Sequence, residues 1–319
     1  ADSMSRVIPE ERRRKVGAPR TNIELLPVFA DELTGLEFRI SGVIGTGVKA
    51  SVFRAENLTN TEHSLRAKLF SPEQAQGANL AEIIEQIVEY QSNMDDPNIL
   101  RIIGTATLEG SPVILYEHLP VDAETILMQK PDGLPLDLII RMLPQILNGL
   151  GYAHMHRGKD GAIRRLPHMS LKPSKLLLDD EMTVVKIDEC GVCKALMDGR
   201  DYDPDPWDTL GTDPAARAPE TFVLDSKFVN LALMDIYGLG ALLYRLVTGQ
   251  PPFSCASIDE YRFAHLRKYP VPPRVHRYDI PLWLDEMILK CLEKEPTARW
   301  RSATQMELAL GTEAGKRAP

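Results

Sequence analysis

The chain is poor in cysteine and has no long apolar run, and each absence restricts the class of protein. There are 4 cysteines among 319 residues, whereas secreted disulfide scaffolds are short and dense in cysteine. No run of 18 apolar residues occurs, and the first residues lack the apolar core of a signal peptide. We therefore expect no membrane span and a cytoplasmic location.

Basic residues are also outnumbered by acidic residues. The formal net charge is −8, and because nucleic acid selects basic surfaces, we expect no general affinity for it. Hydrophobic residues make up 44% and charged residues 26% of the chain, which are the proportions of an ordinary globular protein. The length fits one large domain, or two modest domains that share a cleft.

Two of the cysteines form a C-x-x-C pair, Cys190 and Cys193. A zinc site normally needs four ligands, and Cys255 and Cys291 do not form a second pair of this kind, so zinc is not favoured. A redox pair usually opens a helix after a strand, whereas we expect a loop here. Neither chemistry is therefore the preferred interpretation.

The pattern of the sequence changes along the chain. Residues 1–35 form a basic N-terminal extension, in which residues 6–20 hold six basic and two acidic side chains. We expect a solvated tail there, and the alternative is a docking arm for an acidic partner. Residues 36–117 are rich in strand patterns, residues 118–310 are mainly helical, and residues 311–319 form a C-terminal tail.

The strand-rich part predicts a five-stranded antiparallel sheet and one helix. The β-rich runs span residues 37–57, 64–70, 99–110 and 111–119. The helix is expected within residues 74–94, with one face made by Leu80, Ile84, Ile87 and either Tyr90 or Gln91. Together with the helical part, this indicates an α+β protein of two lobes with a cleft between them.

The helical part contains two informative runs. Residues 135–156 carry an apolar stripe of Leu136, Ile139, Ile140, Leu143, Ile146, Leu147 and Leu150. Pro144 lies within this helix and should kink it, at a cost of about 3 kcal/mol. Residues 228–249 are apolar nearly all round, which predicts a buried helix. Asp235 lies in that run, and because a buried carboxylate must be paired, we expect it to hold a backbone loop.

Six motifs, in order, identify a resemblance. They are "IGTGVKASV", "RAKLF", "HMSLKPSKLLLD", "KIDECGVCK", "GTDPAARAPE" and "DIYGLGALLYRLVTGQPPF". In this order and spacing they resemble a eukaryotic-type serine/threonine protein kinase domain over about residues 36–310, and the end of the match resembles bacterial members most closely. The resemblance implies a bilobal kinase-like fold and ATP as the cofactor.

The resemblance also implies a nucleotide site. Lys68 matches the lysine that grips the phosphates, and Tyr116 matches the residue that guards the pocket behind the adenine. The positions expected to bind nucleotide are Gly45, Gly47, Val52, Ala67, Lys68, Tyr116, Glu117, Lys175 and Leu177. The third glycine of the phosphate loop is replaced by Ala50. The glutamate that usually pairs with the lysine falls on Ile87, so only a shifted helix would bring Glu85 or Glu89 to Lys68.

The metal-binding positions depart from the family. Glu189-Cys190-Gly191 stands for Asp-Phe-Gly, and Lys175 stands for the asparagine that holds the second metal ion. The longer side chain of Glu189 suits octahedral magnesium poorly. Lys175 could instead replace the metal beside the phosphates, or form a salt bridge with Glu189. Asp188 should point away from Glu189 by strand alternation.

The catalytic base is also absent. Ser170 occupies the position of the catalytic aspartate, and a hydroxyl with no adjacent acceptor is too weak a base near neutral pH. Met169 replaces the arginine that would bind an activation-segment phosphate, so Thr209 and Thr212 are poor candidates for a phosphorylation switch. Scaffold positions are kept: His168 and Asp235 match the pair that holds the catalytic loop, and Glu220 and Arg299 match a buried ion pair. We expect these four residues to stabilise the fold, because losing one partner of a buried pair is costly.

Two segments suggest binding surfaces. An insertion, "KDGAIRRLP", precedes His168, and it is strongly basic in its middle. The segment 198–208 holds five aspartates against one arginine and would suit a basic partner.

The leading hypothesis is a pseudokinase, a regulatory or protein-binding module that lacks phosphotransfer and binds ATP weakly or without metal. One alternative is an active serine/threonine kinase or nucleotide transferase that uses Lys68 and Glu189. Another is a scaffold whose nucleotide cleft is occluded. A protein partner is expected in each case, and the sequence does not identify it.

Overall fold

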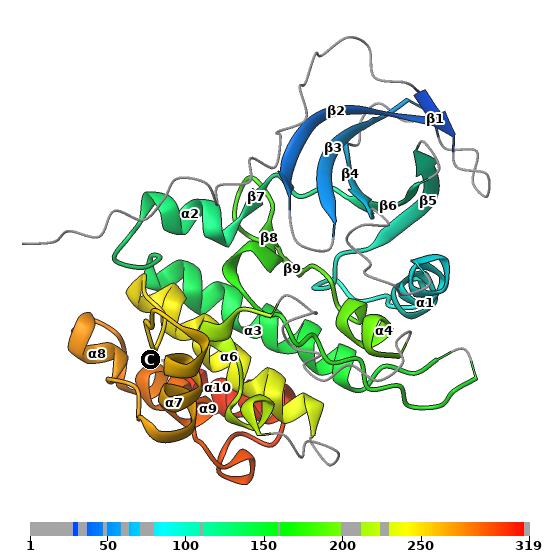
Figure 1. Ribbon diagram of the computed structural model, residues 1–319. Helices are drawn as coiled ribbons and strands as arrows, with labels where there is room; N and C mark the ends of the chain where they lie inside the picture. Colours follow the sequence, from blue (N-terminus) through cyan, green and yellow to red (C-terminus); the bar gives the residue numbers. More distant parts are fainter. Residues whose placement is uncertain are drawn as a thin grey trace, which may run out of the picture.

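The computed structural model describes residues 28–30, 37–46, 50–58, 64–70, 80–108, 111–158, 160–198, 212–223 and 230–315. These residues form a sheet-rich lobe and a larger helical lobe, as Figure 1 shows. The α+β bilobal architecture expected from the sequence is therefore present. The basic residues 6–20 and most of the acidic segment lie outside the described residues.

The smaller lobe contains a six-stranded antiparallel sheet in the order β1-β2-β3-β4-β6-β5. Its strands are β1 (Val28–Ala30), β2 (Glu37–Thr46), β3 (Ser51–Asn57), β4 (Ser64–Leu69), β5 (Ile102–Leu108) and β6 (Ser111–Glu117). The helix α1 (Leu80–Ser92) packs beside β5 and β6. Its buried face consists of Ile83, Ile84, Ile87 and Gln91.

The prediction of five strands was wrong by one. The additional strand, β1, pairs antiparallel with β2, with Val28 opposite Arg39 and Ala30 opposite Glu37. It lies before residue 36, where the sheet was expected to begin. Three residues are too few to produce a readable alternation of apolar and polar side chains, so the pattern gave no signal there.

Strand β4 is internal to the sheet, and this determines the surroundings of its lysine. Leu65, Arg66, Ala67 and Lys68 are all buried, although a strand with one solvated face would alternate. Neighbours on both sides, β3 and β6, complete its hydrogen bonding. A charged side chain on such a strand requires partners within the fold.

The helical lobe also contains a small sheet in the order β7-β8-β9. The sheet strands are β7 (Val121–Asp122), β8 (Leu176–Leu178) and β9 (Val185–Ile187). The α-helices are α2 (Ala123–Gln129), α3 (Leu136–His154), α4 (Val192–Asp198), α6 (Leu231–Thr248), α7 (Ile258–Arg267), α8 (Pro273–His276), α9 (Leu282–Cys291) and α10 (Ala303–Gly315). Short 3-10 turns include Pro173–Lys175, Pro214–Ala216, Pro219–Phe222 and Pro296–Ala298.

Helix α3 continues through Pro144 without interruption. Its inner face includes Leu143, Ile146, Leu147 and Leu150, and each of these is fully buried. Burying one such side chain contributes about 1.5–3 kcal/mol, so a few of them offset the cost of about 3 kcal/mol that an interior proline imposes. Burial of the apolar stripe therefore keeps this segment helical despite Pro144.

Helix α6 is the central helix of the larger lobe. It is long and apolar enough to cross a membrane by length and composition, but 72% of the tested window is buried within the fold, as in the core helix of a folded domain. Asn230 caps its first turn by accepting a hydrogen bond from the Ala232 amide. Gly249 ends it with a φ of 77°, and a Cβ there would overlap the Pro131 carbonyl, so only glycine fits.

Candidate functional site

Four charged side chains meet where the two lobes face each other. Lys68 on β4 donates to both carboxylate oxygens of Asp188, at 2.8 and 2.9 Å, and to Oε1 of Glu189 at 3.0 Å. Lys175, at the end of a 3-10 turn, lies 2.5 Å from the same Oε1 and 3.9 Å from Oδ2 of Asp188. We call these residues the Lys–Asp–Glu–Lys cluster. It contains two positive and two negative charges, so it is electrically balanced.

The expectation that Asp188 points away from Glu189 was wrong. Strand β9 ends at Ile187, so the alternation of a strand does not extend to either acid. Glu189 has a φ of 67°, in the left-handed region, so the backbone turns at this residue and does not continue the extended conformation of a strand. Both carboxylates therefore reach Lys68. The salt bridge between Lys175 and Glu189, one of the two alternatives for Lys175, is present.

Burial and charge act in opposite directions on this cluster. Burial would raise the pKa of Asp188, but Lys68 and Lys175 outweigh it and hold that pKa below its usual value. Burial would lower the pKa of Lys175, but Glu189 and Asp188 raise it above its usual value. Burial does lower the pKa of Lys68, against the two carboxylates. The short contacts and the shifts of Asp188 and Lys175 favour an ionised cluster.

No glutamate of α1 pairs with Lys68. Ile87, at the expected glutamate position, is fully buried in the core, and Glu85 and Glu89 are exposed. Among the described residues, the carboxylate partners of Lys68 come from the other lobe, and its ammonium lies 5.1 Å from the centre of the Tyr116 ring. The doubt, raised from the sequence, that a glutamate of α1 pairs with Lys68 is therefore confirmed.

Helix α1 is instead attached to the cleft by neutral hydrogen bonds. Gln91 donates through Nε2 to the Cys190 carbonyl at 2.7 Å, and its Oε1 accepts from the Tyr116 hydroxyl at 2.8 Å. Tyr116 is fully buried, as expected of the residue behind the adenine position. Sequence reasoning left either Tyr90 or Gln91 on the inner face of the helix and missed this role of Gln91. A buried amide on an apolar face was the available signal.

The catalytic loop is held as the sequence predicted. Asp235 accepts hydrogen bonds from the backbone amides of His168 and Met169, at 2.6 and 2.7 Å, and lies 2.8 Å from His154. His168 Nδ1 accepts from the Ser170 amide at 3.2 Å, so its Nε2 carries the proton and donates to the Asp188 carbonyl at 2.8 Å. This network connects the loop to the cluster.

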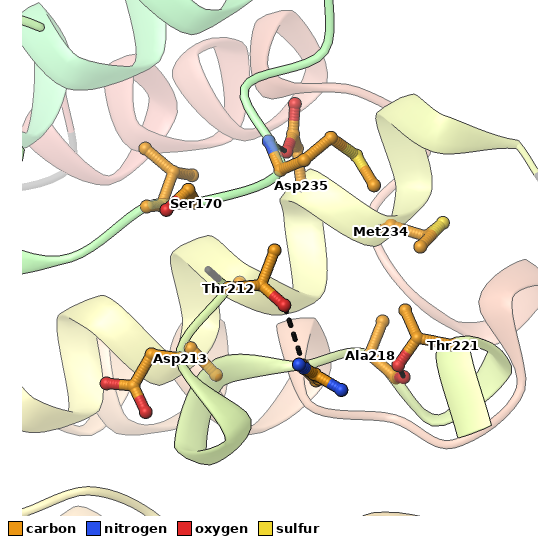
Figure 2. Close-up of a pocket in the computed structure, with 12 residues that line it drawn as sticks. Ser170, Thr212, Asp213, Ala218, Thr221, Met234 and Asp235 are labelled. Atoms are coloured by element: carbon orange, nitrogen blue, oxygen red, sulfur yellow. Dashed lines mark hydrogen bonds between the residues drawn. The ribbon is translucent and has the colours of Figure 1, made fainter. Parts of the chain in front are cut away.

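A small cavity lies beside the position of the absent base (Figure 2). Its volume is about 30 Å³, and Ser170, Thr212, Arg217 and Asp235 are among its lining residues. Arg217 donates through Nε to the Thr212 hydroxyl at 2.7 Å, and both residues are buried. Such a space accommodates water-sized groups. Ser170 provides no carboxylate, and the two acids that line the cavity accept from backbone amides: Asp235 from His168 and Met169, and Asp213 from Ala215.

The expected nucleotide-binding positions that the structure describes lie on strands β2, β3, β4, β6 and β8 and at the end of the turn Pro173–Lys175. Ala67 and Leu177 are fully buried, and Val52 lies opposite both Gly45 and Lys68 in the sheet. Gly47 and Thr209 lie outside the described residues. Glu117 accepts from Lys186 at 2.7 Å and from the Arg101 amide at 2.8 Å. Contact of these residues with a nucleotide stays a prediction.

Magnesium does not fit the arrangement found here. The cluster carboxylate oxygens already face ammonium groups at 2.5–3.0 Å, and Lys175 has no lone pair for a metal while charged. Within the described ranges, no group of three or more His, Cys, Asp or Glu residues is placed to hold a metal ion. The expectation that magnesium binds poorly stays a prediction.

The cysteine pair lies at the start of a helix, and the expectation of a loop was wrong. Cys190 precedes α4 and Cys193 falls in its first turn. Neither cysteine forms a disulfide, and both side chains are buried. Burial raises the pKa of Cys190, which is opposite to the shift that activates redox cysteines.

The scaffold ion pair expected in the helical lobe is present. Arg299 donates two parallel hydrogen bonds of 2.8 Å to the carboxylate of Glu220. It also donates to the carbonyls of Leu233, Glu293 and Lys294. A bidentate pair of this kind fixes both position and orientation.

Comparisons with known proteins agree with this architecture. A family model described as the protein kinase domain matches residues 38–308. The chain is 22% identical over 272 residues to a probable serine/threonine-protein kinase of Clostridium acetobutylicum, covering 84% of this chain and 38% of that one. It is 24% identical over 279 residues to the serine/threonine-protein kinase PknB of Mycobacterium leprae, covering 86% and 42%. The chain thus spans about two fifths of the length of these relatives.

Solved structures show the same fold. Rad53 residues 1–466 in complex with AMP-PNP superposes with a TM-score of 0.66 at 21% identity, covering 85% of this chain and 64% of that one. A variant of the kinase domain of PknI from Mycobacterium tuberculosis gives 0.63 at 18% identity, covering 92% and 99%. From the family match and the retained fold, the chain belongs to the protein kinase family, and its relatives include bacterial serine/threonine kinases.

Proposed function

We propose that this protein is a pseudokinase, a regulatory or protein-binding module that transfers no phosphate and binds ATP weakly and without metal. The observation that carries the proposal is the Lys–Asp–Glu–Lys cluster. Lys175 stands at the position where the family has the asparagine that holds the second metal ion, and it forms an ion pair with Glu189, the only acid of the altered Asp-Phe-Gly motif.

Phosphoryl transfer requires phosphates to be held, metal ions to neutralise them and a carboxylate to orient the attacking hydroxyl. The last two are lost in this chain, because Lys175 competes with any metal for Glu189 and Ser170 provides no carboxylate. An ATP phosphate would also have to displace Asp188 from Lys68, since both of its oxygens bind that ammonium. These costs support weak binding and argue against turnover.

Two other functions compete with this proposal. The position of Lys68, 1% exposed and within 3.0 Å of Glu189, favours an active kinase or nucleotide transferase that uses this pair. The buried negative charge of Asp188 favours a scaffold that excludes nucleotide. The transferase should bind ATP and transfer its phosphate, whereas the scaffold should not bind ATP.

Thermal unfolding with ATP, in EDTA and in magnesium, tests the proposal. We expect ATP to raise the melting temperature by a similar small amount in both solutions, since Lys175 replaces the metal. No rise in either solution would support the scaffold. A parallel incubation with radiolabelled ATP and a generic protein substrate should give no incorporation with magnesium or manganese.

The matched variants are Lys68→Ala and Lys130→Ala. Lys130 is exposed at the end of α2, so its loss should leave the ATP response unchanged. Lys68→Ala should abolish the ATP response, judged against the melting temperature of that variant without ATP. Radiolabel incorporation that persists in Lys130→Ala and disappears in Lys68→Ala would establish the transferase instead.

A further inference from the structure

Strand β4 carries a second buried cation, Arg66, two residues before Lys68. Side chains of a strand alternate between its two faces, so Arg66 and Lys68 lie on the same face of the sheet. Arg66 is directly opposite Tyr116 of β6 in the register. Leu65 and Ala67 belong to a separate hydrophobic cluster on the other face. We call the face that carries Arg66, Lys68 and Tyr116 the inner face, because Lys68 there reaches the Lys–Asp–Glu–Lys cluster.

Arg66 is a buried cation without a hydrogen-bonding partner among the described residues. It is 8% exposed, and its Nε has no hydrogen-bond partner. The two carboxylates of the cluster contact Lys68 and Lys175 instead. Burying an unpaired charge is costly, so its retention in a folded protein requires an explanation.

The charge of Arg66 acts on the segment where the nucleotide base was expected. Burial, together with the charges of Arg54 and Arg66, lowers the pKa of the His118 imidazole, so this ring is neutral near pH 7. His118 directly follows Tyr116 and Glu117, and its buried Nδ1 also has no hydrogen-bond partner. Two unsatisfied polar groups therefore lie in the region of an expected base site.

A guanidinium suits phosphate better than it suits adenine. It has five N–H donors and no acceptor, so it offers nothing to the amino group of adenine, which also donates. Phosphate oxygens, in contrast, accept from two of these donors at once. Leu177, another position expected to bind nucleotide, is fully buried by the protein. It therefore presents no exposed apolar surface for a base to cover.

Arg66 offers a phosphate a contact that needs no exchange of carboxylates. A phosphate at Lys68 has to displace Asp188, whose two oxygens both accept from that ammonium. The Nε of Arg66 has no such partner to displace. A strand rises about 3.3 Å per residue, so the two backbone positions are about 6.6 Å apart. A chain of phosphates that begins at Arg66 therefore extends to Lys68.

We propose that the inner face binds its ligand through a polyphosphate chain anchored on Arg66, and that it does not select adenine. This inference rests on the proposed metal-free binding of ATP and names the part of ATP that is recognised. Arg66 is the residue that determines this specificity. Other nucleoside triphosphates and inorganic tripolyphosphate are then ligands of the same site.

Thermal unfolding of the full chain in EDTA tests the proposal with ATP, GTP, inorganic tripolyphosphate and adenosine at equal concentrations. We expect the first three to raise the melting temperature by similar amounts and adenosine to leave it unchanged. No rise with any ligand would overturn both this inference and the proposed binding of ATP. A rise with ATP but not with tripolyphosphate, or a rise with adenosine, would overturn this inference alone.

Arg66→Met tests the anchor, since it keeps an unbranched side chain and removes the charge. The tripolyphosphate concentration that gives half of the rise should increase about tenfold, the effect of losing one good charge contact. Arg66→Lys keeps the charge and should keep most of the response. Because the Met variant breaks no ion pair with Asp188 or Glu189, its melting temperature without ligand should not fall.

Arg267→Met provides the matched control, because Arg267 is exposed on α7 in the other lobe and the change in charge is the same. A single cooperative transition without ligand identifies the variants that fold, and Arg66→Gln is a second neutral variant should Arg66→Met fail to fold. An unchanged tripolyphosphate response in the neutral variant would overturn the proposal. Equal weakening in Arg267→Met would also overturn it.

Discussion

Lys175 and Glu189 form a 2.5 Å ion pair that joins the catalytic loop to the segment after β9. In the family to which this chain belongs, these two positions are occupied by groups that share a metal. Here a positive side chain contacts the acid directly, and Lys68 contacts the same oxygen at 3.0 Å. The positive charges that balance the two carboxylates are therefore lysine side chains of the protein itself.

Removing Lys175 should leave a site that binds a divalent cation. In Lys175→Asn, Glu189 and Asp188 lose the Lys175 ammonium and keep Lys68, so we expect the free energy of unfolding to fall by about 3 kcal/mol, the cost of breaking a largely buried pair. Magnesium should then raise the melting temperature of the variant, because an amide oxygen and two carboxylates suit a hard cation. Urea unfolding and thermal scans in EDTA and magnesium measure both effects.

Lys186→Asn is the matched control for this experiment. Lys186 forms a comparable 2.7 Å pair with Glu117, and both side chains are about one fifth exposed, at 18% and 22%. Its loss should lower stability without creating a response to magnesium. A magnesium response in the wild type or in Lys186→Asn would contradict the claim that Lys175 occupies the position of the metal.

The sequence predicted the scaffold better than the details of the cleft. Asp235 was predictable because a charge within an apolar run requires partners, and Arg299 because it matches an ion pair of the family that the chain resembles; both were found with their partners. The direction of Asp188 was not predicted, because strand alternation was extended past the end of β9, where Glu189 has left-handed backbone. Strand β1 was too short to produce a pattern.

The hydrogen bond between Tyr116 and Gln91 should show strong energetic coupling. Tyr116→Phe leaves Oε1 of a buried amide unpaired and should cost about 2 kcal/mol. Gln91→Leu should cost a similar amount, because it leaves the tyrosine hydroxyl and the Cys190 carbonyl without this partner. The double variant should lose less than the sum, by at least about 0.5 kcal/mol. Urea unfolding of the four proteins measures the cycle.

Tyr244→Phe serves as the control for that cycle, since the Tyr244 hydroxyl donates to the Val271 carbonyl at 2.9 Å, in the other lobe. Its effect should add to that of Gln91→Leu without coupling. Strict additivity of Tyr116→Phe and Gln91→Leu would show that the two side chains do not stabilise each other.

His265 should make the stability of the helical lobe depend on pH. Burial, together with Lys294, lowers its pKa to about 3, and its ring accepts from the Tyr237 hydroxyl and donates to the Pro214 carbonyl. The unfolded chain binds a proton at this histidine below about pH 6.5, whereas the folded chain does not. Stability therefore falls as pH falls, by as much as about 2 kcal/mol between pH 6.5 and 5.

Urea unfolding at several pH values between 5 and 7 checks this dependence. His265→Asn should be less stable at pH 7 and should have a flatter pH profile, while the exposed His276→Asn should keep the slope of the wild type. An unchanged slope in His265→Asn would assign the pH dependence to other groups.

The four cysteines should differ sharply in their reaction with iodoacetamide. Cys190, Cys193 and Cys291 are buried, and burial raises the pKa of Cys190 and of Cys291, so little thiolate is available. Cys255 is partly exposed and should react first in the folded protein. Mass spectrometry after timed labelling measures the order, and Cys255→Ser should remove the fast phase. Fast labelling of Cys190 or Cys193 in the folded protein would mean that the C-x-x-C pair is accessible, and a redox role would again have support.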